Sequence, residues 1–390
     1  MKKFGKIAAL VAALCFALVF VGCSNSSDSS SAPTQITPTT PTTPTTPTGG
    51  GTGTDNGGGQ QTGGGTTQTQ PAASGDYKKV DTVTINGTSY DIVTFGLWPQ
   101  TIKADSVTVD TSVTEPHGAF TYCKGSDGQW YVEQAEKAHE SVYKYSDGTT
   151  TVGQGGTSTK WFKVEPIKWR VLTNSYGGAK LLLAESILTG GVLYYLNQSS
   201  RTISGGATVY ANNYKYSTIR AWLNGSYEAD DTQDTTHAGK GFLQSAFTAA
   251  QQSAIKTTTV DNSAESTTDT GNNTTKATGY KCVNTSDKIF LLSEKEVTTS
   301  AYGFAAYNKY VGDSSGTTSS TRIRSTTDFA KATGAFQSST ASMGGWWWLR
   351  SPDYRYDNIV RSVGTYGDAS SSFNVNNSSG GVAPALCIAN

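Results

Sequence analysis

The pattern of apolar and polar residues predicts β-strands over much of the chain after residue 76. The two classes alternate from Thr82 to Ile85 and again from Thr88 to Phe95, as in strands with one buried face. Asn86-Gly87 separates these runs, and Asn-Gly between alternating segments is the strongest short signal for a β-hairpin. Further apolar runs predict strands at 162–172, 180–184 and 288–293.

Two segments have the periodicity of helices instead. Residues 217–223 (STIRAWL) begin with Ser217, a residue type that caps helix N-termini. The second segment places on one helical face the apolar residues Phe242, Leu243, Ala246, Phe247, Ala250 and Ala254. No regular strand–helix–strand alternation accompanies these helices, so we expect an α+β fold with mainly antiparallel strands and two helices.

The N-terminal segment predicts export. Lys2, Lys3 and Lys6 precede an apolar run that is too short to span a membrane, so residues 1–22 are expected to be a signal peptide. Cys23 follows a small residue, as in the bacterial lipobox, which predicts lipidation at Cys23. An ordinary signal peptide with an incidental cysteine is the alternative. Lipidation would anchor the protein at the cell surface, and we expect the outer membrane to be the membrane that holds the anchor.

The segment from residue 23 to residue 75 differs in composition from the rest. It is rich in Pro, Thr and Gly and has too little apolar surface to offset the entropy of ordering. We therefore expect a disordered stalk at 23–75, which separates the anchor from one globular domain at 76–390.

Composition narrows the class of protein. The 30 Lys+Arg balance the 30 Asp+Glu, so no basic surface predicts a nucleic-acid partner. Charged residues are 15% of the chain, against roughly 25% in an average soluble domain. Ser, Thr, Asn, Gly and Tyr supply the polar remainder, which is typical of an extracellular β-rich protein.

Motifs for catalysis or metal binding are absent from the sequence. His117, His139 and His237 have no metal-ligand spacing, and there is no Gly-x-Ser-x-Gly or Cys-x-x-Cys motif. We expect no catalytic residue, no metal and no cofactor. The domain has an odd number of cysteines, so either one disulfide and a free thiol or no disulfide is expected among Cys123, Cys282 and Cys387.

The C-terminal residues carry the most specific pattern. Trp346, Trp347 and Trp348 predict a strand with at least one buried face, and Arg350 is expected to pair with a buried acid or carbonyl. A polar loop, a strand, a turn, a strand and a closing strand should follow. Tyr, Ser, Asp, Asn and Arg are dense between residues 353 and 374, as in binding paratopes. A solvated extracellular surface is the alternative interpretation.

Residues 353–390 also lack Lys, Glu, Gln, Met and Trp altogether. Codons ending in C cannot encode these five residue types. Randomising both adenines of AAC codons produces the same omission, so the pattern suggests adenine-directed mutagenesis of this region.

WWWLRSP (346–352), the polar stretch after it and GGVAPAL (380–386) together resemble the variable proteins of bacterial diversity-generating retroelements. The rest of the domain is similar to secreted bacterial proteins that share it, through FGLWPQ (95–100), PIKWRVL (166–172), STIRAWLN (217–224) and KIFLLS (288–293). The resemblance covers residues 76–390. Ala383 stands where many relatives have Arg, which removes any ion pair made by that Arg.

The resemblance implies a C-type lectin fold, of the kind related to formylglycine-generating enzymes. The variable region at about 344–390 would display diversified side chains on a constant scaffold formed by 346–352, Gly367 and 380–386. The ligand-binding positions that the resemblance implies are Asp353, Tyr354, Arg355, Tyr356, Asp357, Asn358, Arg361, Ser362, Thr365, Tyr366, Ser370, Ser371, Ser372 and Asn374.

The expected function is therefore that of a lipid-anchored surface protein without enzymatic activity, which binds varied protein or glycan ligands. A carbohydrate-binding adhesin of fixed specificity is an alternative, and its calcium-dependent form would use Asp353, Asp357 and Asn358. An enzyme on the formylglycine-generating scaffold is a further alternative, and it would require accessible reactive cysteines or a metal.

Overall fold

The computed structural model describes residues 74–139, 141–231, 236–267, 280, 282–305, 321–340, 342–369 and 371–390. The predicted signal peptide at 1–22, Cys23 and all but the last two residues of the linker at 23–75 lie outside these ranges. Within the described ranges, no helix has the length and apolar character needed to cross a membrane.

The predicted hairpin is present at the start of the domain. β1 (Lys78–Ile85) and β2 (Thr88–Ile102) are antiparallel, and the last residue of β1 pairs with the first residue of β2. Asn86 and Gly87 have φ angles of 50° and 80°, as a two-residue type I′ turn requires. The sequence signal for the hairpin is confirmed.

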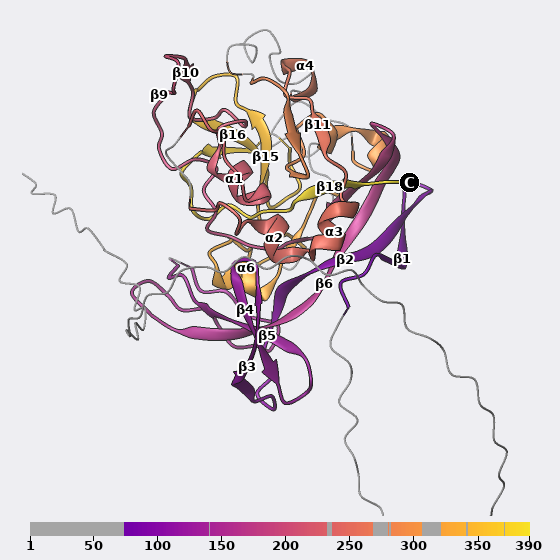
Figure 1. Ribbon diagram of the computed structural model, residues 1–390, viewed down its shortest axis with the longest axis vertical. Coiled ribbons are helices and arrows are strands. Elements are labelled where there is room, and N and C mark those ends of the chain that lie inside the picture. Colours follow the sequence, from indigo (N-terminus) through magenta and orange to yellow (C-terminus); the bar gives the residue numbers. More distant parts are fainter. Residues whose placement is uncertain are drawn as a thin grey trace, which may run out of the picture. The chain divides into compact units, whose positions relative to one another are not determined.

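The largest sheet is antiparallel and contains nine strands. Its main path runs β13 (Ile289–Phe290), β18 (Ala385–Ile388), β7 (Ala179–Ala184), β6 (Thr159–Tyr176), β5 (Trp130–Ala135), β4 (Phe120–Gly125) and β3 (Val109–His117). β2 pairs along the other edge of β6 (Figure 1). The strands predicted at 162–172 and 180–184 are confirmed, whereas the segment predicted at 288–293 pairs only through β13.

The C-terminal segment forms a second, three-stranded antiparallel sheet. Its order is β15 (Trp347–Pro352), β16 (Ile359–Val363) and β17 (Ser371–Asn374). The predicted succession of strand, loop, strand, turn, strand and closing strand is therefore confirmed, with β18 as the closing strand. Unlike β15–β17, β18 crosses to the large sheet, where it pairs with β7 and β13.

Outside the two sheets, three further pairs of short strands form among the described residues. They are β9 (Arg201–Thr202) with β10 (Thr208–Val209), β11 (Thr258–Val260) with β12 (Thr285–Asp287), and the parallel pair β8 (Ser186–Ile187) with β14 (Ser325–Thr326).

The helices are short, and their arrangement corrects the expectation of two. α1 (Thr218–Asn224) begins after Ser217, whose side chain accepts a hydrogen bond from the Arg220 backbone, as predicted. The second expected helix is divided into α2 (Phe242–Ala246) and α3 (Ala249–Ala254), because Thr248 caps a new N-terminus between them. The other helical segments are α4 (Ala264–Thr267), α6 (Asp328–Ala332), η1 (Glu296–Thr298) and η2 (Ser300–Tyr302).

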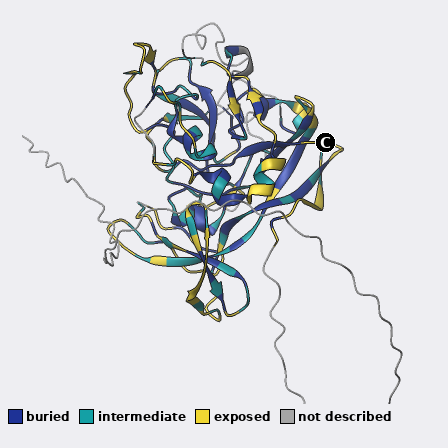
Figure 2. Ribbon diagram, viewed as in Figure 1, coloured by how far each residue is buried: buried dark blue, intermediate teal, exposed yellow. Residues whose placement is uncertain are grey.

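One hydrophobic core extends from the large sheet to the C-terminal sheet. Each of three fully or almost fully buried tryptophans donates its indole N–H to a backbone carbonyl: Trp98 to Leu188, Trp169 to Phe95 and Trp347 to Arg322. All six residues of β15 are buried (Figure 2). Trp346, Trp347 and Trp348 are thus buried on both strand faces, as the Trp run led us to expect on at least one. The described residues form an α+β fold of mainly antiparallel strands.

Candidate ligand-binding site

The loop from residue 353 to residue 358 connects β15 to β16 and carries a group of exposed aromatic and charged side chains. The chain leaves the core at Asp353, which is fully buried, and reaches the surface within two residues. Tyr354 is half-buried, whereas Arg355 and Tyr356 are exposed, with 53% of Tyr356 accessible to solvent. The loop thus presents an amphipathic tip on a buried base.

Asp353 holds the loop through its carboxylate. Oδ1 accepts hydrogen bonds from the backbone N–H of Arg355 at 2.8 Å and from Arg355 Nε at 3.0 Å, while Oδ2 accepts from Arg355 Nη2 at 3.0 Å. Arg361 on β16 also lies near this carboxylate, with Nη2 3.5 Å from Oδ2. This bidentate geometry restricts the Arg355 side chain far more than a single ion pair would.

Aromatic rings flank the two arginines. The Arg355 guanidinium carbon lies 5.5 Å from the centre of the Tyr354 ring and 5.7 Å from that of Tyr356, and Arg361 lies 6.0 Å from Tyr354. These distances are within the range of cation–π attraction. The tip of the loop is therefore a cluster of two tyrosines around an arginine.

The base of the loop is fastened to the segment before α1. The Asn212 backbone N–H donates to the Asp357 carbonyl at 2.9 Å, and its side-chain amide donates to the carbonyls of Tyr356 at 2.9 Å and Ile359 at 3.2 Å. Asn212 is completely buried. Because two carbonyls of the loop and that of the first residue of β16 converge on this single residue, Asn212 holds the backbone of the loop without contacting its exposed side chains.

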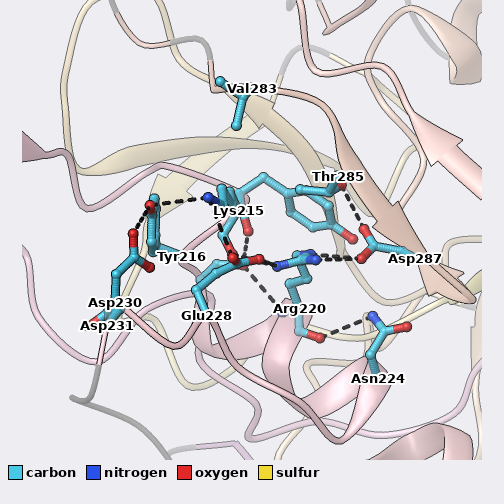
Figure 3. Close-up of polar contacts among 12 residues, drawn as sticks. Lys215, Tyr216, Arg220, Asn224, Glu228, Asp230, Asp231, Val283, Thr285 and Asp287 are labelled. Carbon is cyan, nitrogen blue, oxygen red and sulfur yellow. Dashed lines mark hydrogen bonds and ion pairs between the residues drawn. The ribbon is translucent and has the colours of Figure 1, made fainter. Parts of the chain in front are cut away.

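A charged cluster fixes this supporting segment in turn (Figure 3). Arg220 of α1 contacts the Lys215 carbonyl at 2.8 Å, Glu228 at 2.5 Å and Asp287 at 2.8 Å. Lys215 Nζ lies 3.4 Å from Glu228 and 3.2 Å from the Tyr216 hydroxyl. Burial opposes the charge of Arg220, but Asp287 outweighs this effect and raises the pKa of Arg220 above its usual value. The cluster thus fixes Lys215, which lies three residues after Asn212, and so helps to hold the segment that supports the loop.

The turn between β16 and β17 is the second exposed part of the C-terminal sheet. Gly364 and Asp368 close it through a backbone hydrogen bond of 2.8 Å, and the buried Arg322 donates from Nε to the Gly367 carbonyl at 2.7 Å. Tyr366 at its tip is 55% exposed. A buried arginine therefore anchors this turn, much as Asp353 anchors the loop.

The core beneath both segments is closely packed. The rings of Trp346 and Phe373 stack with their centres 3.9 Å apart. Gly380 lies directly over Trp348, where an added Cβ would be 2.2 Å from the indole nitrogen. The loop at 353–358 and the turn at 364–369 therefore lie on a closely packed core.

The predicted pairing of Arg350 with a buried acid or carbonyl is confirmed. It is 1% exposed, donates from Nη1 to the Leu291 carbonyl at 2.8 Å, and forms a two-point ion pair with Glu296. Burial disfavours the charge of Glu296, yet Arg350 and its hydrogen bonds dominate and keep the pKa of Glu296 below its usual value.

The described cysteines are not joined by a disulfide, which resolves the alternative left open by their number. Cys123 and Cys387 are buried and Cys282 is half-buried. Burial raises the pKa of the Cys387 thiol to about 11, so this thiol stays protonated at neutral pH.

The structure divides the predicted binding residues into distinct groups. Exposed positions are Arg355, Tyr356, Tyr366 and Asn374; half-buried positions are Tyr354, Asp357, Asn358, Thr365, Ser371 and Ser372; buried positions are Asp353, Arg361 and Ser362. Ser370 lies outside the described residues. The buried group was expected to be displayed, but Asp353 pairs with Arg355 and Arg361, and both faces of β16 are covered from Val360 to Val363.

Asp353 is poorly suited to bind calcium, because both of its carboxylate oxygens contact Arg355. In the part of the chain that the structure describes, no group of three or more His, Cys, Asp or Glu residues could hold a metal ion.

Several supporting residues were missed by the sequence reasoning. Glu294 is fully buried and its carboxylate lies 3.9 Å from Arg361, and Glu296 pairs with Arg350. Charged residues directly after the apolar run at 288–293, in a chain with few charges, were an available signal. Nothing in the sequence places Asn212 below the loop, because its contact with Tyr356 spans 144 residues.

Comparisons with known proteins place the domain in a family. No curated protein and no solved structure matches the chain. One family model does match, over residues 177–390, which are more than half of the chain and include α1, Asn212 and the whole C-terminal sheet. The chain therefore belongs to the family described as "Domain of unknown function (DUF6273)".

Proposed function

We propose that this chain is a ligand-binding protein whose site consists of the loop at 353–358, the turn at 364–369 and the outer face of β17. The observation that carries the proposal is the tip of the loop, where Tyr354, Arg355 and Tyr356 are accessible while the backbone is held by Asn212 and Asp353. Tyr and Arg dominate binding energy at protein interfaces and lose little conformational entropy when they are already positioned.

The proposal includes a lipid anchor at Cys23, display at the cell surface and the outer membrane as the site of anchoring. The ligand would be a protein or a glycan, because the cluster offers aromatic faces, a guanidinium and small hydroxyl groups rather than a deep apolar pocket. The fold assigned in this proposal is the C-type lectin fold.

We further propose that a diversity-generating retroelement rewrites the exposed positions. Substitutions of exposed side chains away from structural contacts usually change stability by no more than about 0.5 kcal/mol. Tyr356, Tyr366 and Asn374 are exposed, whereas Arg355 is exposed but also pairs with Asp353. Substitution at Asp353, Arg361 or Ser362 would also perturb the buried base, so variation should be narrower there.

An enzymatic function receives less support. The thiol of Cys387 is buried and protonated, and burial also raises the pKa of Cys123 and of Cys282. Thiol chemistry requires an accessible thiolate. A carbohydrate-binding adhesin of fixed specificity uses the same surface and differs from the proposal only in its variability.

Sequencing distinguishes these two binding functions. The 3′ end of the gene should be sequenced deeply in a clonal population and in relatives, together with any near-repeat in the adjacent DNA. Substitutions at adenine positions of the repeat, concentrated in codons 353–374, are expected. A uniform 3′ end without a repeat or a neighbouring reverse transcriptase would refute diversification and leave the fixed adhesin.

A further inference from the structure

A hollow lies in a part of the domain outside the loop at 353–358. Its volume is about 620 Å³, and its lining comes from the turn between β6 and β7, from β11 and the residues on either side of it, from η1 and η2, and from Arg350 of β15. No residue of the loop at 353–358 lines it. Pockets that bind small molecules have volumes of about 300–1,000 Å³, so a monosaccharide can enter this hollow.

The ion pair of Arg350 and Glu296 forms part of its lining. Arg350 is 1% exposed, and its Nε has no hydrogen-bond partner among the described residues. The Tyr176 hydroxyl donates to Glu296 Oε1 at 2.7 Å, which fixes the second oxygen of this carboxylate. The lining therefore contains a guanidinium group that Glu296 and the Leu291 carbonyl hold in a fixed position.

The charged residues that line the hollow leave an excess of one positive charge. Lys256, Lys295 and Arg350 are cationic, whereas Asp261 and Glu296 are anionic. Both lysines are exposed, and Lys256 Nζ is directed along the rim to the Gly177 carbonyl at 2.7 Å. This balance favours a ligand with a single negative charge.

The uncharged lining residues favour a hydroxylated ligand. Tyr176 and Tyr302 are half-buried, and burial together with the nearby Glu296 raises the pKa of each phenol, so both remain neutral. Thr257, Thr259 and Thr299 add hydroxyl groups that both donate and accept hydrogen bonds. Aromatic rings next to hydroxyl groups can hold the apolar face and the polar edge of a sugar ring.

We propose that this hollow is a second binding site, of constant specificity, for a carboxylated monosaccharide unit such as glucuronate or N-acetylneuraminate. The carboxylate binds at the rim between Lys256 and Lys295, and the ring lies against Tyr176 and Tyr302. This site would add a binding activity to the one proposed for the C-terminal sheet. It does not depend on that proposed function.

Isothermal titration calorimetry of the full chain tests this site. Glucuronate, N-acetylneuraminate and the neutral sugar glucose serve as probes. At least one acidic sugar should bind saturably and at least tenfold more tightly than glucose. The double variant Lys256→Gln/Lys295→Gln should bind that sugar at least tenfold more weakly, whereas Lys78→Gln, at an exposed lysine on β1, should stay within twofold of the parent chain.

Three outcomes would overturn the site: no saturable binding of either acidic sugar, equal binding of glucose, or unchanged binding by the double variant. Both rim lysines are exposed, so their substitution leaves the fold intact. Tyr356→Ala should leave acidic-sugar binding unchanged. Loss of binding in that variant would reassign the sugar to the loop at 353–358 and refute a separate site.

Discussion

Asp353 shows how one residue can determine the shape of the candidate site. Its carboxylate is completely buried, and it is tolerated there because two arginines and a backbone N–H surround it. A buried charge that loses its partners is costly, so the stability of the loop depends on this cluster, to which Arg355 contributes, rather than on the exposed ring of Tyr356. The buried side chains of Asp353 and Arg361 hold the loop in position, whereas the exposed ring of Tyr356 is available to contact a ligand.

Asp353→Asn is expected to lower the free energy of unfolding by about 2 kcal/mol, because Arg361 remains buried with less compensating charge. Chemical denaturation followed by fluorescence measures this change. Asp357→Asn, at a half-buried neighbour in the same loop, should change stability by no more than about 0.5 kcal/mol. Equal effects of the two substitutions would show that the buried cluster has no special importance.

Tyr356→Ala tests recognition at the same scale. The ring is 53% exposed, so the thermal midpoint should remain that of the parent chain, while affinity for a ligand found in a protein or glycan screen should fall at least tenfold. Surface plasmon resonance gives the affinity. Tyr227→Ala is the matched control, because Tyr227 is 42% exposed and lies outside the loop. Equal losses in both variants would contradict a site centred on the loop.

At the scale of elements, the strands of the C-terminal sheet depend on the segment that covers them. Gly380 and Gly381 pass over β15, and the Gly381 carbonyl accepts a hydrogen bond from the Trp348 backbone at 3.0 Å. Any side chain at Gly380 would overlap the Trp348 indole. The glycine is thus required for close approach and not for an unusual backbone angle.

Gly380→Ala should therefore destabilise the domain by about 1–3 kcal/mol through overpacking. Its thermal midpoint, measured by calorimetry, is compared with that of Gly153→Ala. A Cβ at Gly153 would meet its nearest neighbour, Val142, at 3.5 Å, which is an ordinary contact. If the two midpoints fall equally, close packing at Gly380 is not the cause.

The division of α2 from α3 is also decided at this scale. The apolar periodicity of residues 242–254 is real, since Phe242, Leu243 and Ala246 are buried. Thr248 nevertheless forms a capping box with Gln251, which starts a new helix and leaves no residue of α3 buried. Periodicity identified the buried face of α2, whereas Ala250 and Ala254, predicted on the same face, are exposed on α3.

At the scale of the whole molecule, the pair of Arg350 and Glu296 connects distant parts of the chain. Glu296 lies in η1, Arg350 in β15 and Tyr176 at the end of β6, and all three side chains are in contact. Glu296 thus connects the C-terminal sheet, through its ion pair with Arg350, to the large sheet, through its hydrogen bond from Tyr176.

This pair predicts acid sensitivity. Because the pKa of Glu296 is lowered in the folded protein, its stabilising contribution is complete above the ordinary carboxyl pKa of about 4.3 and is lost as the pH falls through the lower folded value. The thermal midpoint should fall between about pH 5 and about pH 3. Glu296→Gln should be less stable at neutral pH and show a shallower fall, and parallel pH profiles would exclude this pair as a source of the sensitivity.

Local sequence determined the hairpin at Asn86-Gly87, the capped start of α1, the strands β6 and β7 and the succession of strands after Trp346. Each depends on interactions between residues near in sequence, or on an alternation of apolar residues that any buried strand requires. The same reasoning identified the loop at 353–358 as a candidate site, because its composition differs from that of a core strand.

Tertiary structure alone decided which of the predicted binding residues are accessible. Asp353, Arg361 and Ser362 are buried, and Asn212 and Glu294 enter the site from segments far away in sequence. The hollow lined by Arg350 and Glu296 also combines four separate parts of the chain. Residue type and local spacing carry no information about such contacts, since burial and ion pairing depend on the packing of the complete domain.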